Sequence, residues 1–466
     1  MTSAADVLQP VIIGAGPAGI RAAQILVRAG LRPIVLDEAP RAGGQIYRQP
    51  PPGFMRSKSD LYGSEHRKAD ALHSTMDTLA AEMDYRPGTL VWNGDGQTLD
   101  TLREGVAQTV PYSHLILATG ATDRVLPFEG WTTPGVYTLG GSQVALKYQG
   151  CAIGSRVVFM GTGPLLYLVA YQYKKAGADV VAVLDTASYG DALAGLPGML
   201  RAPRLLALGL YYMAWLRAHG VALHKNIRPV AVDGGTRVTA LRYRVRDRET
   251  VHTLDCNAVG YGLNLRSETQ LASLLGCAFD FNAQDRAWLP RRDPSGRTSI
   301  PGVYVAGDGS GIAGADAAEL SGERAAWTLL GDAARPVDAR RVAQLDTRLS
   351  TIRRVRAALE RAFPFPADWV GGLSEQTVLC RCEDITVGTV RHAARELDVG
   401  ELNRLKALTR VGMGRCQGRM CSAAATEVLA QARGTLPHSV GRLRAQPPIK
   451  PLPIAIVPAD TREVSL

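Results

Sequence analysis

The segment that most constrains the fold lies near the start of the chain, where the sequence VIIGAGPAGIRAAQILVRAGLRPIVLDE sets a glycine motif between two apolar runs. Residues 11–13 predict a short buried strand, and apolar side chains then recur at helical spacing as far as residue 29. A second apolar run at residues 34–36 predicts another strand. The motif between them has the spacing GxGxxG and consists of Gly14, Gly16 and Gly19. Strand, glycine turn, helix and strand in this order predict a βαβ unit of a parallel sheet.

This glycine motif has the features of a dinucleotide site. The first glycine permits a tight turn, the second lets the backbone approach a pyrophosphate, and the third lets helix and strand pack closely. The amides at the helix start attract phosphate, and an acid at the end of the second strand can accept hydrogen bonds from ribose hydroxyls. Asp37 and Glu38 stand at that position. We therefore predict that this segment binds a dinucleotide.

Three later stretches indicate that the dinucleotide is FAD. RAGGQ follows the second strand, LILATG ends a buried strand at a small-residue turn, and IPGVYVAGDGSG ends another strand at an acid that can accept a hydrogen bond from a flavin ribityl hydroxyl. The candidate FAD-binding residues in them are Gly44, Gln45, Thr119, Gly120, Gly307 and Asp308. Together with GxGxxG, these stretches resemble the two-dinucleotide-binding-domain flavoproteins, the broad family of glutathione and thioredoxin reductases, over residues 8–330. The resemblance implies an α/β fold in which a Rossmann-like FAD domain carries an inserted NAD-type domain.

The inserted domain is expected to have an impaired nucleotide site. Its sequence SRVVFMGTGPLLYLVAYQYKKAGADVVAVLD repeats strand, turn, helix and strand, and it retains Gly161 and Gly163. Leu166 occupies the third glycine position, where its bulk would keep helix and strand apart. Asp185 ends the next strand and would disfavour a ribose 2′-phosphate, so NAD is preferred over NADP if either binds. We expect a retained structural domain, in which NAD is doubtful as a cofactor.

Four of the seven cysteines are clustered late in the chain, in CRC and in RCQGRMC. The four candidate metal ligands are Cys380, Cys382, Cys416 and Cys421. Four thiolates suit an iron–sulfur cluster or a structural zinc, but zinc sites more often have two to four residues between the members of each pair. We therefore prefer an iron–sulfur centre in a small helical C-terminal domain. Arg381, Arg415 and Arg419 beside the ligands would stabilise its negative charge.

The cysteine pattern resembles the small 2Fe–2S domain of the bacterioferritin-associated-ferredoxin type, in a version fused behind flavoprotein domains. The whole chain resembles the FAD- and 2Fe–2S-containing component of bacterial multi-subunit amino-acid and opine dehydrogenases. This family includes the A subunit of opine oxidases, the alpha subunit of D-hydroxyproline dehydrogenase and the B subunit of hydrogen cyanide synthase. The motifs that carry the resemblance are VIIGAGPAG, LDEAPRAGGQIYR, LATGATDRVLPFEGW, VAGDGSGIAGADAAELSG, CRCEDIT and GMGRCQGRMC.

The resemblance implies an electron-transferring subunit that passes electrons between FAD and a 2Fe–2S cluster. Its implied partners are a flavin-dependent amine-oxidising subunit together with a small ferredoxin-like subunit. No side chain here is identified as a substrate base, so the catalytic residues and the electron acceptor are unknown. Two other functions stay open: a stand-alone NADH-dependent ferredoxin-type reductase, and a non-catalytic redox scaffold or sensor.

The expected domains follow the order of the motifs. They are an FAD-binding domain at residues 1–125 and 290–335, an inserted NAD-type Rossmann domain at 126–289, a helical linker at 336–375, a 2Fe–2S cluster-binding domain at 376–435 and an extended proline-rich tail at 436–466. The cysteines outside the cluster-binding domain stand singly, so we expect them to be buried apolar side chains. These are Cys151, Cys256 and Cys277.

Composition narrows the class and the location of the protein. With 46% hydrophobic and 21% charged residues the chain has the composition of a globular protein, and its net charge of +10 is by itself no evidence for a nucleic-acid partner. The start of the chain lacks the features of a secretory signal, so we expect a cytoplasmic location, with peripheral association at the inner membrane left open. The longest apolar run, residues 205–216, is shorter than the roughly twenty residues that cross a bilayer. It is predicted to be a buried helix, with a membrane-touching or subunit-facing helix as the alternative.

Overall fold

The computed structural model describes residues 8–458, apart from the side chains of Ser64 and Pro458. Its first unit is built on a five-stranded parallel sheet with the strand order β20-β7-β1-β2-β3. The strands are β1 (Pro10–Ile13), β2 (Ile34–Leu36), β3 (Asp84–Arg86), β7 (His114–Leu117) and β20 (Val303–Val305). The strands β1 and β2 are buried throughout, as the apolar runs in the sequence predicted. The predicted βαβ unit is therefore present.

The two faces of this sheet are covered differently. One face packs against helices α1 (Pro17–Arg28), α3 (His66–Leu79) and α9 (Ala315–Asp332) through an apolar core. The other face shares a second apolar core with the antiparallel strands β4 (Thr89–Gly94), β5 (Thr98–Arg103) and β6 (Val106–Pro111). Short elements complete this unit: α2 (Lys58–Tyr62), η1 (Gly63–Glu65), η2 (Gly307–Ser310), α8 (Gln270–Leu274), and the hairpin of β18 (Phe279–Asn282) and β19 (Ala287–Pro290). Covering layers on both faces bury the sheet and leave the carboxyl ends of its strands to form a site.

The inserted unit has a second five-stranded parallel sheet, in the order β12-β11-β10-β16-β9. Its strands are β9 (Val136–Thr138), β10 (Arg156–Thr162), β11 (Asp179–Asp185), β12 (Ala222–His224) and β16 (Ala258–Leu263). Its helices are α4 (Leu139–Lys147), α5 (Pro164–Lys175), α6 (Tyr189–Met199) and α7 (Pro203–Ala218), and a three-stranded sheet of β13 (Ile227–Asp233), β14 (Ala240–Val245) and β15 (Val251–Asp255) lies beside them. The two chain crossings between the units, β8 (Ala121–Asp123) and β17 (Leu265–Ser267), pair as an antiparallel ribbon. Because α8 packs into the core of the first unit, we propose that the inserted unit ends near residue 263.

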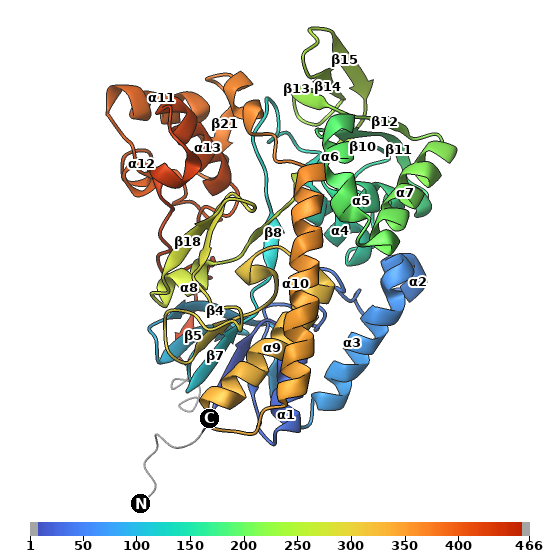
Figure 1. The fold of residues 1–466 in the computed structure, drawn as a ribbon. Helices are drawn as coiled ribbons and strands as arrows, with labels where there is room; N and C mark the ends of the chain where they lie inside the picture. Colours follow the sequence, from blue (N-terminus) through green and yellow to red (C-terminus); the bar gives the residue numbers. More distant parts are fainter. Residues whose placement is uncertain (1–7, 459–466) are drawn as a thin grey trace, which may run out of the picture.

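A long helix, α10 (Ala339–Ala362), joins both units (Figure 1). At its first half Arg324 of α9 pairs with Asp346 at 2.9 Å. At its second half Gly195 and Gly198 of α6 lie so close that an added Cβ would overlap α10 side chains. The predicted linker thus packs along its length against the rest of the molecule.

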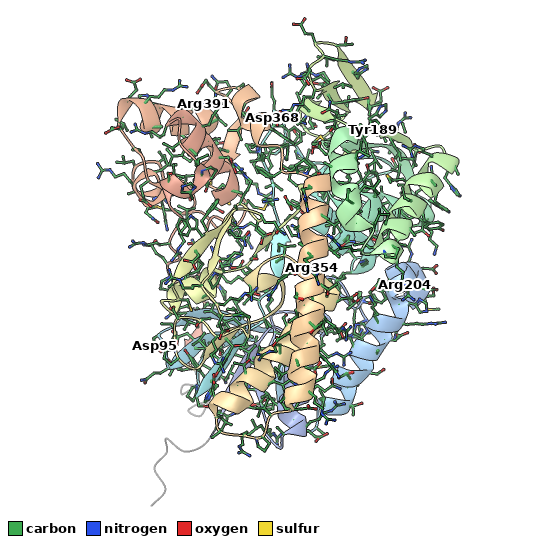
Figure 2. All side chains as sticks on the ribbon, in the orientation of Figure 1. Asp95, Tyr189, Arg204, Arg354, Asp368 and Arg391 are labelled. Carbon is green, nitrogen blue, oxygen red and sulfur yellow. The ribbon has the colours of Figure 1, made fainter. Side chains whose placement is uncertain are left out.

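The C-terminal module follows this helix. It contains η3 (Ala367–Gly372), β21 (Val378–Cys380), β22 (Ile385–Thr386), α11 (Val387–Glu396), α12 (Leu402–Thr409), α13 (Ser422–Ala432) and η4 (Pro437–Val440). Its apolar core is continuous with that of the inserted unit. Two hydrogen bonds also join the units: the Trp369 indole donates to the carbonyl of Pro127 at 2.9 Å, and the Trp131 indole donates to the carbonyl of Val378 at 2.5 Å. Asp368, seen between the two in Figure 2, receives a bidentate hydrogen bond from Arg228 of β13. The module is therefore docked by buried contacts.

The chain beyond η4 returns over the first unit. Ile449 donates its amide to Trp92, and Lys450 pairs with Glu38 at 2.7 Å. The last described strand, β23 (Val457–Pro458), pairs with β6. The tail thus contains short regular elements in η4 and β23, and residues 459–466 of the predicted tail lie outside the described residues.

Two sequence predictions about burial are wrong. The apolar run at 205–216 does form most of α7, but within that helix only Leu216 is fully buried, since α7 packs through one side alone. Leu210 is 54% exposed and Tyr211 is 49% exposed. Cys151, predicted to be buried, is exposed in the turn after α4, whereas the other two single cysteines are buried.

Candidate functional site

The first glycine turn is packed so tightly that side chains are excluded. Gly14 has a φ of 104° and donates its amide to the Leu36 carbonyl at 2.7 Å. An added Cβ on Gly14 would overlap the carbonyl of Ala118, and one on Gly19 would overlap the carbonyl of Gly14. The backbones of α1, β1 and the loop after β7 therefore meet directly. This is the close packing that the motif predicted.

The second glycine loop lies against the first. A Cβ on Gly44 would approach the Cα of Gly16 to 3.0 Å, so the two backbones face each other without intervening side chains. Gly16, at the start of α1, provides no side-chain cap, whereas at the start of α9 the amide of Gly314 donates to the carboxylate of Asp308 at 3.0 Å. The two bare loops and the start of α1 form a surface that suits the phosphates of a dinucleotide.

The two acidic side chains after β2 lie in different environments. Asp37 is buried, and its carboxylate accepts from the amides of Ala15 at 2.5 Å and Ala39 at 2.6 Å. Burial raises the pKa of Asp37, and these two hydrogen bonds oppose that shift. Glu38 faces solvent and pairs with Lys450. Gln45, also a predicted FAD contact, is exposed and accepts from Arg48 at 2.9 Å.

The loops that end β7 and β20 meet at the same edge of the sheet. Asp308 accepts from the amides of Ala313 at 2.9 Å and Gly314 at 3.0 Å, and burial raises the pKa of its carboxyl group. Gly309, in the loop after β20, lies against the loop after β7. A Cβ added to Gly309 would come within 2.8 Å of the Thr119 hydroxyl oxygen. The predicted residues Thr119, Gly120, Gly307 and Asp308 are therefore brought together by the fold.

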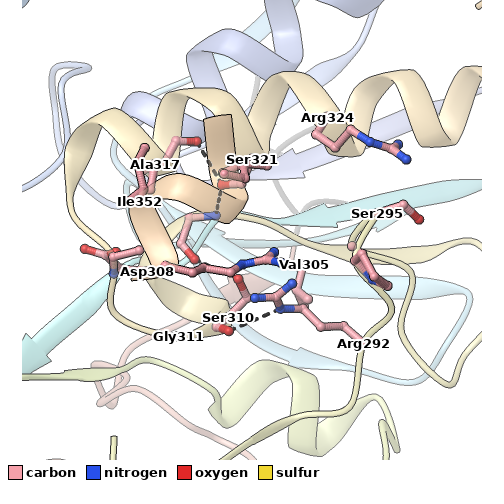
Figure 3. A pocket seen from close by; sticks show the side chains of 17 residues that line it. Arg292, Ser295, Val305, Asp308, Ser310, Gly311, Ala317, Ser321, Arg324 and Ile352 are labelled. Atoms are coloured by element: carbon pink, nitrogen blue, oxygen red, sulfur yellow. Dashed lines mark hydrogen bonds between the residues drawn. The ribbon is translucent and has the colours of Figure 1, made fainter. Parts of the chain in front are cut away.

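A small cavity lies behind the β20 loop, between α9 and α10 (Figure 3). Its volume is about 40 Å³, and Arg292, which lines it, donates to the carbonyl of Ser310 at 3.2 Å. A space of this size holds a few water molecules, not a dinucleotide. The dinucleotide surface is thus the open side of the loops, which the glycines leave bare.

The NAD-type site of the inserted unit is filled by protein groups. Asp185 is fully buried and accepts from the Tyr167 hydroxyl at 2.7 Å, the Lys225 ammonium at 2.8 Å and the Ala187 amide at 2.9 Å. The ring of Phe363, which follows α10, lies 5.6 Å from the Lys225 nitrogen. A ribose could reach this acid only if these side chains moved. Leu166 is fully buried in the core beneath α5, and a Cβ on Gly163 would overlap the side chain of Asn264.

The four clustered cysteines come together in the C-terminal module. Cys380 ends β21, Cys416 lies in the loop after α12, and Cys421 precedes α13. The Cys421 thiol is hydrogen-bonded to the side chains of Cys380 and Cys416. The side chain of Cys416 is also hydrogen-bonded to that of Cys382. All four are free of disulfides. The predicted donor set is therefore assembled from segments about thirty-five residues apart in the chain, and its chemistry fits four-thiolate ligation.

The protonation of these thiols follows from their mutual contact. The hydrogen bond from Cys421 lowers the pKa of Cys416 to about 5 and that of Cys380 to about 6, whereas the pKa of Cys421 itself is raised. Between residues 8 and 458, no group of three or more His, Cys, Asp or Glu side chains is arranged to hold a metal ion.

A short segment, residues 264–270, connects the β7 and β20 loops with the cysteine loop. On one side, the Glu268 backbone accepts from the Thr119 hydroxyl at 2.7 Å and donates to Gly120 at 2.9 Å. The Ser267 hydroxyl donates to the carbonyl of Asp308 at 2.5 Å. The segment is thus bonded to both loops of the dinucleotide surface.

On the other side, the same segment holds the loop between Cys416 and Cys421. Arg266 donates to the carbonyls of Gly418 at 3.2 Å and Arg419 at 2.9 Å, and to the Ser422 hydroxyl at 2.7 Å. The Glu268 carboxylate pairs with Arg419 at 2.6 Å. The sequence analysis did not identify Arg266 and Glu268 as functional residues. The segment LRSETQ that contains them has no motif that would indicate a role.

Three comparisons with known proteins bear on this arrangement. Residues 8–322 match the family model described as pyridine nucleotide-disulphide oxidoreductase, and residues 374–461 match the sarcosine oxidase A3 domain. The A subunit of opine oxidase from Rhizobium meliloti is 37% identical over 459 residues, which are 95% of this chain and 86% of that protein. The HcnB subunit of hydrogen cyanide synthase from Pseudomonas aeruginosa is 36% identical over 470 residues, 96% of this chain and 98% of that protein.

The chain belongs to the family of opine oxidase A subunits and their relatives. Among solved structures, L-proline dehydrogenase from P. horikoshii has the same fold, with a TM-score of 0.69 at 20% identity over 97% of this chain and 79% of that chain. Thioredoxin reductase of T. acidophilum matches 70% of this chain and 98% of its own at a TM-score of 0.52 and 21% identity. The predicted α/β fold class and the predicted family are confirmed.

As a member of the opine oxidase A family, the chain is a flavin-dependent oxidoreductase, and its match over residues 8–322 supports FAD binding. Of the three arginines predicted to stabilise a cluster, Arg419 is neutralised by Glu268, and Arg381 and Arg415 are exposed. Residues 8–458 contain no helix with the length and apolar character needed to traverse a bilayer.

Proposed function

We propose that this chain is the electron-transferring subunit of a multi-subunit dehydrogenase that oxidises an amino acid or an opine at a C–N bond, and that it carries FAD and a 2Fe–2S cluster. When bound, FAD accepts an electron pair and the iron–sulfur centre exchanges single electrons. The relatives named above are subunits of opine oxidase and of hydrogen cyanide synthase. Their names support a hetero-oligomer in which this chain has a redox role.

The residues that would hold FAD are those of the bare dinucleotide surface. Gly14, Gly16 and Gly19 would admit the pyrophosphate, with Gly44 facing it. The Asp37 carboxylate has further lone pairs that can accept hydrogen bonds from ribose hydroxyls. Both amides that donate to Asp308 bind its Oδ1, which leaves Oδ2 to accept from a flavin hydroxyl. Thr119, Gly120 and Gly307 would line the flavin end. The four cysteines would ligate the cluster as thiolates, once they lose their protons.

The single observation that carries this proposal is the connection made by residues 264–270. One short segment is hydrogen-bonded both to the loops of the proposed flavin site and to the loop between two proposed cluster ligands. The side chains of Glu268 and Arg419 are nearly buried, so their ion pair is shielded from solvent. Such a contact keeps two redox centres at a constant separation, which suits electron transfer between them.

The proposed partners follow from what this chain lacks. Its described residues contain no identified substrate base, so we assign C–N bond oxidation to a flavin-dependent amine-oxidising subunit, with a small ferredoxin-like subunit as a further partner. The filled surroundings of Asp185 argue against a stand-alone NADH-dependent reductase. We infer a cytoplasmic location for the assembly.

The test is spectroscopic. Protein prepared anaerobically should show flavin absorbance together with cluster absorbance, and should contain iron and sulfide in equal amounts, two of each per chain. Rapid mixing with NADH should leave the flavin oxidised. Zinc in place of iron would refute the cluster, and fast bleaching by NADH would refute the direction of electron flow.

A further inference from the structure

The outer sides of α6 and α7 are apolar although both helices lie at the surface of the molecule (Figure 1). Among residues 8–458, sixteen large hydrophobic side chains are exposed, and six of them fall within the short stretch of these two helices. The six are Tyr189, Leu193, Leu200, Leu205, Leu210 and Tyr211, with exposed fractions between 38% and 68%. Figure 2 shows Tyr189 at the start of α6 and Arg204 at the start of α7. Single exposed hydrophobic side chains are common on protein surfaces, but six of them within two adjoining helices form a patch, and such patches mark binding sites.

The outward orientation of α6 is fixed by its glycines. Gly195 and Gly198 lie against Ala358 and Ala362 of α10, where no side chain fits. The opposite side of α6 carries its exposed residues at helical spacing. These are Tyr189, Leu193, Pro197 and Leu200. No charged side chain interrupts this stripe.

The helix α7 continues the same surface. Its inner side packs on α5, where the rings of Tyr212 and Trp215 lie 4.7 Å from that of Tyr171. Its exposed, uncharged residues are Pro203, Leu205, Ala207, Leu210, Tyr211, Ala214 and Ala218. A surface helix of a globular protein ordinarily carries charged and polar residues on its outer side. Here the only exposed charges are Arg204 and Arg217, one near each end.

The charged residues in the chain segment that forms most of this surface have one sign. The sequence from residue 192 to residue 232 contains no Asp or Glu. Lys225 and Arg228 are used in internal ion pairs, but Arg201, Arg204 and Arg217 form no ion pair with any described residue. The surface therefore combines two apolar stripes with unpaired guanidinium groups at its edges.

We propose that the outer sides of α6 and α7 bind the surface of a membrane leaflet that contains anionic lipids. Leucine and tyrosine side chains on adjoining helices can enter the boundary between headgroups and acyl chains, and arginine side chains can reach lipid phosphates from the edge. The helices would lie in the plane of the interface, because none of the described helices can cross a bilayer. This inference does not depend on the proposed redox function.

The chemistry favours lipid over a protein partner. Interfaces between proteins carry about one hydrogen bond per 100–200 Å². The two stripes offer only the hydroxyls of Tyr189 and Tyr211 as polar side-chain groups. The three arginines, which form no ion pair with any described residue, are complementary to an anionic headgroup layer, whose attraction for basic residues falls with added salt.

The test is vesicle flotation of the purified full-length chain. We expect it to float with vesicles of phosphatidylcholine and phosphatidylglycerol, to float poorly with phosphatidylcholine alone, and to be released partly by salt. The double variant Leu193→Glu/Leu210→Glu should lose at least tenfold in vesicle binding. The control Leu436→Glu changes a leucine that is 64% exposed in the C-terminal module, and it should bind as the unchanged chain does.

Unchanged flavin content and unfolding midpoint would show that each variant is folded. The proposal is overturned if the unchanged chain does not bind anionic vesicles, or if the double variant binds as well as the control. It is equally overturned if these leucines prove to be needed for capture of the amine-oxidising subunit while vesicles are ignored, since the surface would then be a subunit interface.

Discussion

Replacing Glu268 by glutamine should loosen the attachment of the C-terminal module. The carboxylate of Glu268 lies 2.6 Å from Arg419, and the two side chains are only 11% and 13% exposed. Burial by itself would raise the pKa of Glu268, but the guanidinium groups of Arg419 and Arg266 more than offset it, and the pKa is lowered. The pair is thus ionised, and the substitution would leave Arg419 charged and nearly buried without its partner.

The expected cost follows from this burial. Removing one partner of a buried ion pair costs about 3–5 kcal/mol, because the remaining charge is uncompensated. The hydrogen bond from Arg419 to the Ile449 carbonyl at 2.6 Å survives in the variant, so we expect a loss of about 3 kcal/mol. One nitrogen of this guanidinium, Nη2, already lacks a hydrogen-bond partner, and the variant would add further unsatisfied groups.

Urea unfolding followed by tryptophan fluorescence would measure this loss, because Trp131 and Trp369 lie where the module docks. Asp70→Asn is the matched control: it breaks the exposed pair of Lys58 and Asp70, whose side chains are 57% and 41% exposed. Such a pair contributes about 0–1 kcal/mol. The double variant Glu268→Gln/Arg419→Gln removes both charges and should recover part of the loss. If Glu268→Gln costs no more than Asp70→Asn, the pair does not hold the module and the reasoning is wrong.

Three further results are expected. Cys416→Ser should retain FAD while losing iron and the absorbance beyond the flavin bands; loss of FAD as well would mean that the module and the flavin unit fold together. Gly19→Val should abolish FAD binding, measured by flavin absorbance after gel filtration, since a Cβ there overlaps the Gly14 carbonyl; Gly235→Ala, which meets no neighbouring atom, is the control. Lys225→Met should lower the free energy of unfolding by about 3–5 kcal/mol because it leaves the fully buried Asp185 without its cation; a change below about 1 kcal/mol in urea unfolding would contradict an ion pair at this site.

Much of the fold was readable because its signals are local. The run from Val11 to Asp37 contains its own strand, turn and helix signals, and the required glycines lie next to the backbones that exclude a side chain. The grouping of Cys380 and Cys382 with Cys416 and Cys421 was inferable because four thiols in two close pairs are typical of a metal-ligand set. In the first case one short segment meets the physical requirement, and in the second two short segments, each with its own close pair of thiols, meet it.

The sequence alone therefore determined the family, the first dinucleotide unit and the set of clustered thiols. Tertiary structure alone decided that α7 is exposed, that Asp185 is enclosed by Lys225 and Tyr167, and that Arg266 reaches the cysteine loop. These outcomes join residues 18 to more than 150 positions apart, or depend on which side of a helix meets a neighbour. Apolar periodicity records that a side chain can be buried, whereas burial itself depends on whether another element packs over it.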